Sequence, residues 1–145
     1  MTINELRFAK LSRDAKIPTR KNPDDAGFDL YSIEEVNIAP HNYHIIGTGI
    51  SVDIPKSYVG LVLPKSRNNF LLGGGVVDSG YQGEVLIKVF NILSEYLKIS
   101  SGQAFAQLLV VPIETPTAIE VSIQDLYKEK SPRGETGGIA EQKKL

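Results

Sequence analysis

The chain has 145 residues, a length that suits one domain with a real hydrophobic core and is too short for two full domains and a linker. Its 16 basic and 17 acidic residues give a formal net charge of −1, which argues against a protein that coats nucleic acid through clustered positive charge. Because it has no cysteine and only two histidines, disulfides, thiolate zinc sites and a cysteine nucleophile are excluded, and a histidine metal site is not expected.

The sequence also gives expectations about compartment and membrane. The chain has no stretch of about 18 apolar residues, so no transmembrane helix is predicted. The first ten residues are of mixed charge and lack the apolar core of a signal peptide. We therefore expect no membrane partner and a cytoplasmic compartment.

Patterns with a period of two residues dominate the chain. Between His44 and Ile54 every second residue is apolar or threonine, which predicts a half-buried strand. Residues 58–63, 85–90 and 105–113 are continuous runs of β-forming residues, typical of strands buried on both faces. Residues 119–123 alternate again, and residues 122–126 could form one short turn.

Glycine and proline mostly stand between these runs, so the sequence predicts many short strands joined by turns, as in an all-β sandwich or barrel. Residues 128–145 differ from the rest because they are charged, rich in glycine and poor in large apolar groups. We expect a β-barrel domain over residues 1–127 and a flexible C-terminal arm over residues 128–145. Such an arm is either a passive tail or a segment that orders over a ligand or a neighbour.

The first candidate site is the glycine-rich segment 73–84. Asp78 follows two β-branched residues and precedes a Ser-Gly turn, so its carboxylate could stand at the mouth of a hairpin and deprotonate a water. Tyr81 could offer a flat face to a sugar or a base. An ordinary hairpin with a turn aspartate is the alternative.

Two further segments carry polar groups beside apolar runs. Asp29 lies between Phe28 and Leu30, where a carboxylate could serve a hard cation such as Mg²⁺ directly or through water; a turn acid at a strand start is the alternative. Residues 64–69 place two cations, a hydroxyl and two amides at a strand exit, which suits a phosphate chain. They do not form the GxxxxGK[ST] phosphate loop, and a solvated polar turn is the alternative.

Five segments in this order resemble the five motifs of the trimeric dUTP pyrophosphatases (dUTPases): residues 25–30, 64–66, 75–84, 102–108 and 133–138. The similarity runs from about Leu6 to Gly138. It implies a jelly-roll-like distorted β-barrel, assembled as a homotrimer with three sites between subunits and a C-terminal arm that closes over a site. The implied reaction hydrolyses dUTP to dUMP and pyrophosphate with Mg²⁺ on the phosphates, which limits uracil in DNA and supplies dUMP.

The resemblance also implies roles for single residues around the base and sugar. Asp78 would activate the water that attacks the α-phosphorus. Tyr81 would pack against the deoxyribose and exclude a 2′-hydroxyl. The backbone around Gly75 and Leu86 would read the uracil edge, and Ile139 could cover the base only as an aliphatic lid.

The phosphates and the metal would be held by a second group of residues. Ser66 and the Arg67 main-chain amide would hold the β-phosphate, with Lys65 standing where the family often has arginine. Asp29 would bind waters of the Mg²⁺ shell. The remaining phosphate contacts would come from Gln107 and, in the arm, from Arg133 and Gly134.

Four departures from the family pattern affect the phosphate half of the site. The spacing from Ser66 to Asp78 is short, and Lys65 cannot make the bidentate contacts of arginine. Ala104 stands where many members carry arginine or lysine. The segment after Gly138 lacks the usual aromatic residue and phosphate-binding residues, and its Glu141 would repel phosphates. We therefore expect an intact water-activating and base-reading centre with weakened phosphate handling and arm closure.

Two other functions stay open on the sequence. The eroded fifth motif would suit a nucleotide-binding or regulatory protein of the dUTPase fold with weak or no turnover. A deaminase of the related dCTP deaminase group would share the barrel, but its Ser-Ser-Leu-Gly-Arg type of segment is not found after Leu63.

Overall fold

The computed structural model describes residues 2–130 and residue 132, and these form mainly short β-strands. A single short helix, α1 (Ile123–Leu126), follows the last strand of the described part. The strands are β1 (Arg7–Lys10), β2 (Phe28–Tyr31), β3 (Val36–Ile38), β4 (Tyr43–Gly47), β5 (Ile50–Asp53), β6 (Tyr58–Leu63), β7 (Leu71–Leu72), β8 (Gly75–Val77), β9 (Leu86–Phe90), β10 (Leu97–Ile99) and β11 (Ala104–Pro112).

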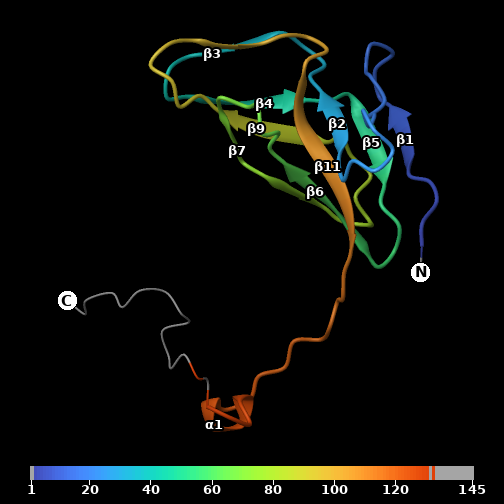
Figure 1. Cartoon of the computed structure of the whole chain (residues 1–145), viewed down its shortest axis with the longest axis vertical. Helices are drawn as coiled ribbons and strands as arrows, with labels where there is room; N and C mark the ends of the chain where they lie inside the picture. The colour runs from blue at the N-terminus through green and yellow to red at the C-terminus, as the bar shows by residue number, and fades with distance from the viewer. Residues whose placement is uncertain (1, 131, 133–145) are drawn as a thin grey trace. The chain divides into compact units, whose positions relative to one another are not determined.

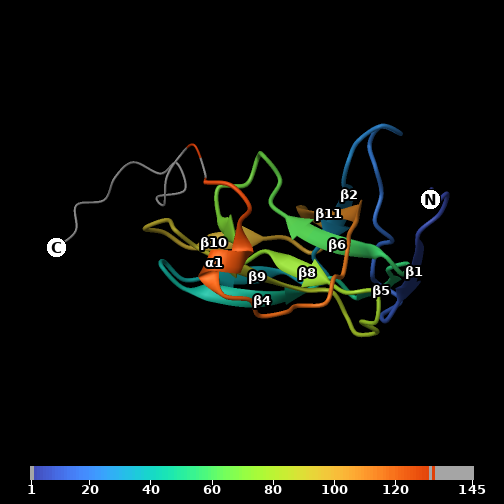
Figure 2. The ribbon, with the colours of Figure 1, turned by 90° about the horizontal axis from the view of Figure 1, so that it is seen from below.

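The strands form four antiparallel sheets, and two of these position the candidate site. The larger sheet has the order β2-β11-β6-β8, and its central strand β11 lies between β2 and β6 (Figure 1). A three-stranded sheet has the order β4-β9-β7, with β4 alongside β9 (Figure 2). The pairs β1-β5 and β3-β10 complete the arrangement, which confirms the all-β prediction.

One hydrophobic core joins these sheets. Its largest fully buried side chains include Phe105 and Leu108 of β11, Leu30 of β2 and Ile87 of β9. Burying side chains of this size stabilises a fold by roughly 1.5–3 kcal/mol each. Within the described residues no buried side-chain nitrogen or oxygen lacks a hydrogen-bond partner. The core therefore offers a rigid support for polar groups at the strand ends.

The single strand expected between His44 and Ile54 is wrong. The chain forms two strands, β4 and β5, which belong to different sheets and are separated at Thr48 and Gly49. Gly49 has φ of +68°, a conformation that favours glycine, so the strand cannot continue through it. Burial alternates as predicted only from Ile50 to Ile54, because residues 46–50 are all buried, Gly47 and Gly49 included.

Two other expectations need correction. The run 85–90 is not buried on both faces, because in β9 the side chains of Leu86, Lys88 and Phe90 are exposed. Residues 119–123 form no strand, and Ile119 and Val121 are exposed. An alternating pattern needs a neighbouring strand edge, and this segment pairs with none of the described strands.

The chain divides into two compact units, Met1–Glu114 and Thr115–Leu145. The first contains all the strands named above. The described part of the second contains α1, whose turn confirms the short turn expected near residues 122–126. The domain boundary expected after residue 127 stays a prediction. Over residues 2–130 and 132, no helix has the length and apolar character needed to cross a membrane.

Candidate functional site

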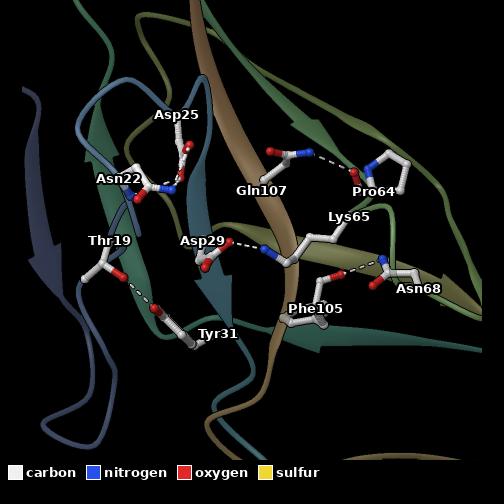
Figure 3. A network of polar contacts seen from close by, with 10 residues as sticks. All are labelled: Thr19, Asn22, Asp25, Asp29, Tyr31, Pro64, Lys65, Asn68, Phe105 and Gln107. Atoms are coloured by element: carbon white, nitrogen blue, oxygen red, sulfur yellow. Dashed lines mark hydrogen bonds and ion pairs between the residues drawn. The ribbon is translucent and has the colours of Figure 1, made fainter.

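Three of the segments singled out in the sequence meet at one end of the larger sheet. In the register of that sheet, Gln107 of β11 stands opposite Asp29 of β2 on one side and Leu63 of β6 on the other. Pro64 and Lys65 directly follow β6. Side chains from residues far apart in sequence therefore face one region, as Figure 3 shows.

Asp29 and Lys65 form an ion pair in that region (Figure 3). Their side chains are 25% and 28% exposed, so the pair is partly sheltered from water. The resemblance had assigned Lys65 to phosphate and Asp29 to the waters of a metal ion. In this structure the two charges pair with each other, and both expected roles stay predictions.

Gln107 is held at the same end of the sheet by two contacts. Its side-chain amide donates a hydrogen bond of 2.9 Å from Nε2 to the carbonyl of Pro64. Its Oε1 lies so close to Gly27 that a Cβ at that position would overlap it. Gly27 is thus required for the position of Gln107, and the first and fourth sequence motifs fit together through this contact.

Asn68 has a structural role that the sequence did not indicate. Between Ala104 and Ala106 the pairing of β11 with β2 shifts by one residue, which leaves Phe105 as the extra residue of a bulge. Asn68 Nδ2 donates a 3.0 Å hydrogen bond to the Phe105 carbonyl. The interpretation of both amides after Lys65 as groups for a phosphate chain stays a prediction, and in this structure the Asn68 amide holds the bulge.

These groups line a cavity of about 710 Å³. Its wall is of mixed character, and both cations and carboxylates line it. The lining residues are Lys21, Asp25, Ala26, Gly27, Asp29, Lys65, Arg67, Asn68, Asn69, Phe70, Gln103, Ala104 and Gln107. A cavity of this size suits a ligand of small-molecule dimensions.

Asp78 lies elsewhere, directly after β8, where its side chain is exposed. The Asp78 carbonyl accepts a 3.1 Å hydrogen bond from the Tyr81 N–H, which forms a tight turn. The hairpin expected around Asp78 is wrong in one respect, because β8 pairs with β6 whereas β9 pairs with β4 and β7. The segment between them crosses from one sheet to another.

Tyr81 is fixed over the same turn. Its hydroxyl donates a 2.6 Å hydrogen bond to the carbonyl of Glu84, and its ring lies against Gly83, where a Cβ would stand 2.5 Å from the hydroxyl oxygen. The ring is 44% exposed, so one part of it stays available to a ligand.

The segment that follows Tyr81 is tied to the turn between β4 and β5. The Glu84 carboxylate accepts a 3.0 Å hydrogen bond from the Gly49 amide, and Thr48 donates its hydroxyl to the Val85 carbonyl at 2.7 Å. The Val85 amide donates in turn to the Ile50 carbonyl at 3.0 Å. These bonds hold in place the backbone that follows Asp78 and Tyr81, a support that the sequence did not predict.

A second hollow of about 390 Å³ lies beside Tyr81. It contains the Arg7–Asp53 ion pair, with a 2.6 Å contact that raises the pKa of Arg7 through the hydrogen bond to Asp53. It is lined by Arg7, Phe8, Ala9, Ser51, Val52, Asp53, Ser79, Tyr81 and Gln82. Neither Asp78 nor Tyr81 lines the first, larger cavity. In one chain, several of the residues expected to bind phosphates line the larger cavity, and Asp78 and Tyr81 lie outside that lining.

The remaining site residues divide into two groups, those that are exposed and those that lie outside the described residues. Gly75 and Leu86 are exposed in β8 and β9, and Ser66 is exposed after β6. Arg133, Gly134 and Ile139 lie outside the described residues. No group of three or more histidine, aspartate or glutamate side chains within residues 2–130 and 132 is arranged to hold a metal ion.

Comparison with known proteins shows which family this chain resembles. The chain matches the dUTPase family over residues 13–137. The deoxyuridine 5′-triphosphate nucleotidohydrolase of Mycolicibacterium vanbaalenii is 35% identical over 93% of this chain and 96% of its own length. That of Mycobacterium leprae is 37% identical over 83% of this chain and 82% of its own length.

Solved structures of dUTPases are also similar to this chain in fold. The dUTPase of Staphylococcus bacteriophage 80alpha with dUPNHPP has a TM-score of 0.83 and 29% identity, covering 93% of this chain and 96% of that one. A mutant dUTPase of phage phi11 of S. aureus, which coordinates a structural Mg(II) ion, has a TM-score of 0.75 and 30% identity, covering 81% of this chain and 97% of that one.

The all-β architecture with a cavity at the strand ends, and the likeness to solved dUTPases, define the class as β-barrel proteins of the dUTPase fold. Within that class the chain belongs to the dUTPase family. The expected jelly-roll-like fold is confirmed with it.

Proposed function

We propose that the chain is a dUTP diphosphatase in which the cavity at the end of β2, β11 and β6 receives the triphosphate. It hydrolyses dUTP to dUMP and pyrophosphate, which limits uracil incorporation into DNA and supplies dUMP. One observation carries the proposal. Asp29 and Gln107 lie on adjacent strands, Lys65 follows the next strand, and all three line a cavity that further cations also line. Its support from relatives is the shared family and 35% identity over almost the whole chain.

Asp78 acts as the general base. Its exposed carboxylate takes a proton from water, the water oxygen bonds to the α-phosphorus, and the bond from that phosphorus to the bridging oxygen breaks to release pyrophosphate. The rigid turn around Asp78 favours this role, because a base fixed in position loses little entropy when the reaction begins.

Tyr81 packs against the deoxyribose and excludes the 2′-hydroxyl of UTP. Because its hydroxyl is held by the Glu84 carbonyl, the ring cannot swing away to admit a larger sugar. The backbone around Gly75 and Leu86 reads the uracil edge. A site built on such hydrogen bonds rejects a wrong base strongly, since buried polar groups would be left unpaired.

The phosphates are bound in the larger cavity. Ser66 and the Arg67 amide hold the β-phosphate, and Gln107 and Lys65, which both line the cavity, contact the other phosphate oxygens. Arg133 and Gly134 of the arm complete the contacts, while Ile139 covers the base. Lys65 can contact a phosphate only when its ion pair with Asp29 opens.

Mg²⁺ arrives with the triphosphate as part of the substrate. The donors fit such an ion, because Mg²⁺ prefers one or two carboxylates together with phosphate oxygens and retained waters, and Asp29 is a partly buried carboxylate on the cavity wall. Asp29 would contact waters of its shell. When bound, the ion neutralises phosphate charge.

The protein works as a homotrimer with sites between subunits. Neither Asp78 nor Tyr81 lines the cavity within one chain, which supports a site to which a neighbouring subunit brings these two residues. The outer face of the β4-β9-β7 sheet exposes Tyr43, Ile45 and Phe90, an apolar surface that a second copy would cover.

A regulatory function is the second candidate. Phage dUTPases related to this chain are described as controlling transfer of virulence genes by a proto-oncogenic G protein-like mechanism. Together with the altered segment after Gly138, this favours testing a nucleotide-binding role that does not need turnover. Such a role would survive replacement of Asp78.

The function is tested by following pyrophosphate release from dUTP, dTTP, dCTP and UTP in the presence of Mg²⁺. We expect release from dUTP alone. Binding of dUTP without release would favour the regulatory function, and ammonia from dCTP would favour a deaminase. Release from all four nucleotides would contradict the proposed base and sugar selectivity.

A further inference from the structure

Three cations line the larger cavity, and they are not equivalent. Lys65 is neutralised by its ion pair with Asp29. Lys21 and Arg67 also line the cavity, are exposed, and take part in none of the ion pairs found in the described part of the chain. The positive charge free to meet an incoming polyphosphate therefore comes from Lys21 and Arg67.

A fixed turn places Lys21 on the cavity wall. The Asp25 amide donates a 3.1 Å hydrogen bond to the Asn22 carbonyl, and the Asp25 carboxylate accepts a 3.0 Å bond from the Asn22 amide. The turn is visible beside β2 in Figure 3. Because it closes directly after Lys21, the chain returns at Gly27 to the same cavity that Lys21 lines.

The residue before Lys21 is also held. The Arg20 guanidinium lies over the Phe28 ring at 3.8 Å from its centroid, and Thr19 bridges to Asp29 in β2. The backbone on both sides of Lys21 is thus fixed, so its side chain starts from a defined point. A long side chain from a fixed point loses less entropy on binding than one from a loose loop.

Ala104 lies on the same cavity wall and offers only a methyl group. This is the position at which a cation is missing from the fourth motif. We propose that the Lys21 ammonium binds the triphosphate of the substrate and supplies this missing positive charge. The proposal rests on the proposed function, although the chemistry it requires is only recognition of a polyphosphate.

The test measures binding of inorganic tripolyphosphate and of dUMP to the full chain by titration calorimetry. We expect Lys21→Ala to weaken tripolyphosphate binding by about 10- to 100-fold, the range for a hydrogen bond to a charged group, and to leave dUMP binding unchanged. Lys21→Arg should keep most of the affinity. Lys56→Ala, which removes an exposed lysine that lines neither cavity, is the matched control and should bind like the wild type.

The outcomes separate this inference from the proposed function. If Lys21→Ala binds tripolyphosphate as tightly as the wild type, the inference is wrong, even when the wild type hydrolyses dUTP. Equal losses for Lys21→Ala and Lys56→Ala would also overturn it, because only general charge would then matter. A selective loss at Lys21 without any hydrolysis of dUTP by the wild type would sustain the inference and contradict the function.

Discussion

At the scale of residues, the site depends on close contacts as much as on charged groups. Gly27 leaves space for Gln107, Gly83 leaves space for the Tyr81 ring, and Asn68 satisfies the carbonyl of a bulge. Gly27 and Gly83 thus fix the positions of Gln107 and Tyr81, two of the predicted site residues, and Asn68 holds the strand that carries Gln107.

Gly27→Ala tests the first of these contacts. The added methyl overlaps Gln107 Oε1, so Gln107 must leave the Pro64 carbonyl and its place on the cavity wall. We expect kcat/KM for dUTP to fall by about 10- to 100-fold, since small displacements in a bound geometry are costly. Gly80→Ala, at a glycine with open space around it, should change little. Equal activity in both variants would show that the contact is not needed.

Asp78→Asn tests the proposed role of Asp78 as the general base. An amide of similar size keeps the exposed turn but cannot accept the proton of the attacking water. We expect kcat to fall by about 10²- to 10⁴-fold, the usual contribution of a general base, with dUTP affinity nearly unchanged. Pyrophosphate release and calorimetric binding measure the two quantities. Normal turnover in this variant would exclude Asp78 as the base.

Residue roles could be predicted from the sequence only in part. Asp29, Lys65 and Gln107 were recognised by their motifs, and the structure brings them together. Their mutual pairing could not be predicted, because an ion pair between residues 36 positions apart depends on which strands become neighbours. Lys21 was missed for the same reason: nothing in its local sequence distinguishes it from a solvated lysine.

At the scale of elements, β11 contributes Ala104 and Gln107 to the cavity, and its bulge is the feature that the sequence could not predict. The run 105–113 predicted the strand because its residues are continuous β-formers, and β11 confirms it. The bulge at Phe105 changes no residue type, so periodicity does not reveal it. The break at Gly49 was missed similarly, since the apolar alternation continues across it.

Asn68→Ala tests the bulge. Without the amide, the carbonyl of the fully buried residue Phe105 loses its partner, and an unsatisfied buried acceptor costs about 1–3 kcal/mol. We expect the free energy of unfolding in urea to fall by that amount. The neighbouring Asn69 is exposed, so Asn69→Ala should stay within about 0.5 kcal/mol of the wild type. Similar stabilities for the two variants would mean that water satisfies the carbonyl equally well.

At the scale of the whole molecule, the proposed assembly rests on the surface that one chain leaves exposed. The β4-β9-β7 sheet turns Tyr43 and Phe90 outward as a contacting ring pair, with Ile45 beside them. The run 85–90 was predicted to be buried on both faces, and a neighbouring subunit would bury its outer face. Sequence patterns do not distinguish burial inside a chain from burial between chains.

Ile45→Glu tests the assembly. A carboxylate on the outer face of β4 would have to lose its hydration when a second copy covers the sheet, whereas in a monomer it stays in water. We expect sedimentation to show a trimer for the wild type, a monomer for the variant, and a matching loss of turnover. Ile45→Val keeps the face apolar and should remain trimeric. A trimeric, active Ile45→Glu protein would place the interface elsewhere.

The most direct measurement of a site shared between subunits uses two inactive variants in one assembly. Asp78→Asn and Asp29→Asn chains, given different affinity tags and expressed together, are purified as mixed trimers and assayed for pyrophosphate release from dUTP. If Asp78 and the cavity come from different subunits, each purified mixed trimer has one site that combines two intact residues, so activity returns to about a third of the wild-type value. Mixed trimers as inactive as either variant alone would place both residues in one subunit's site and contradict the shared site.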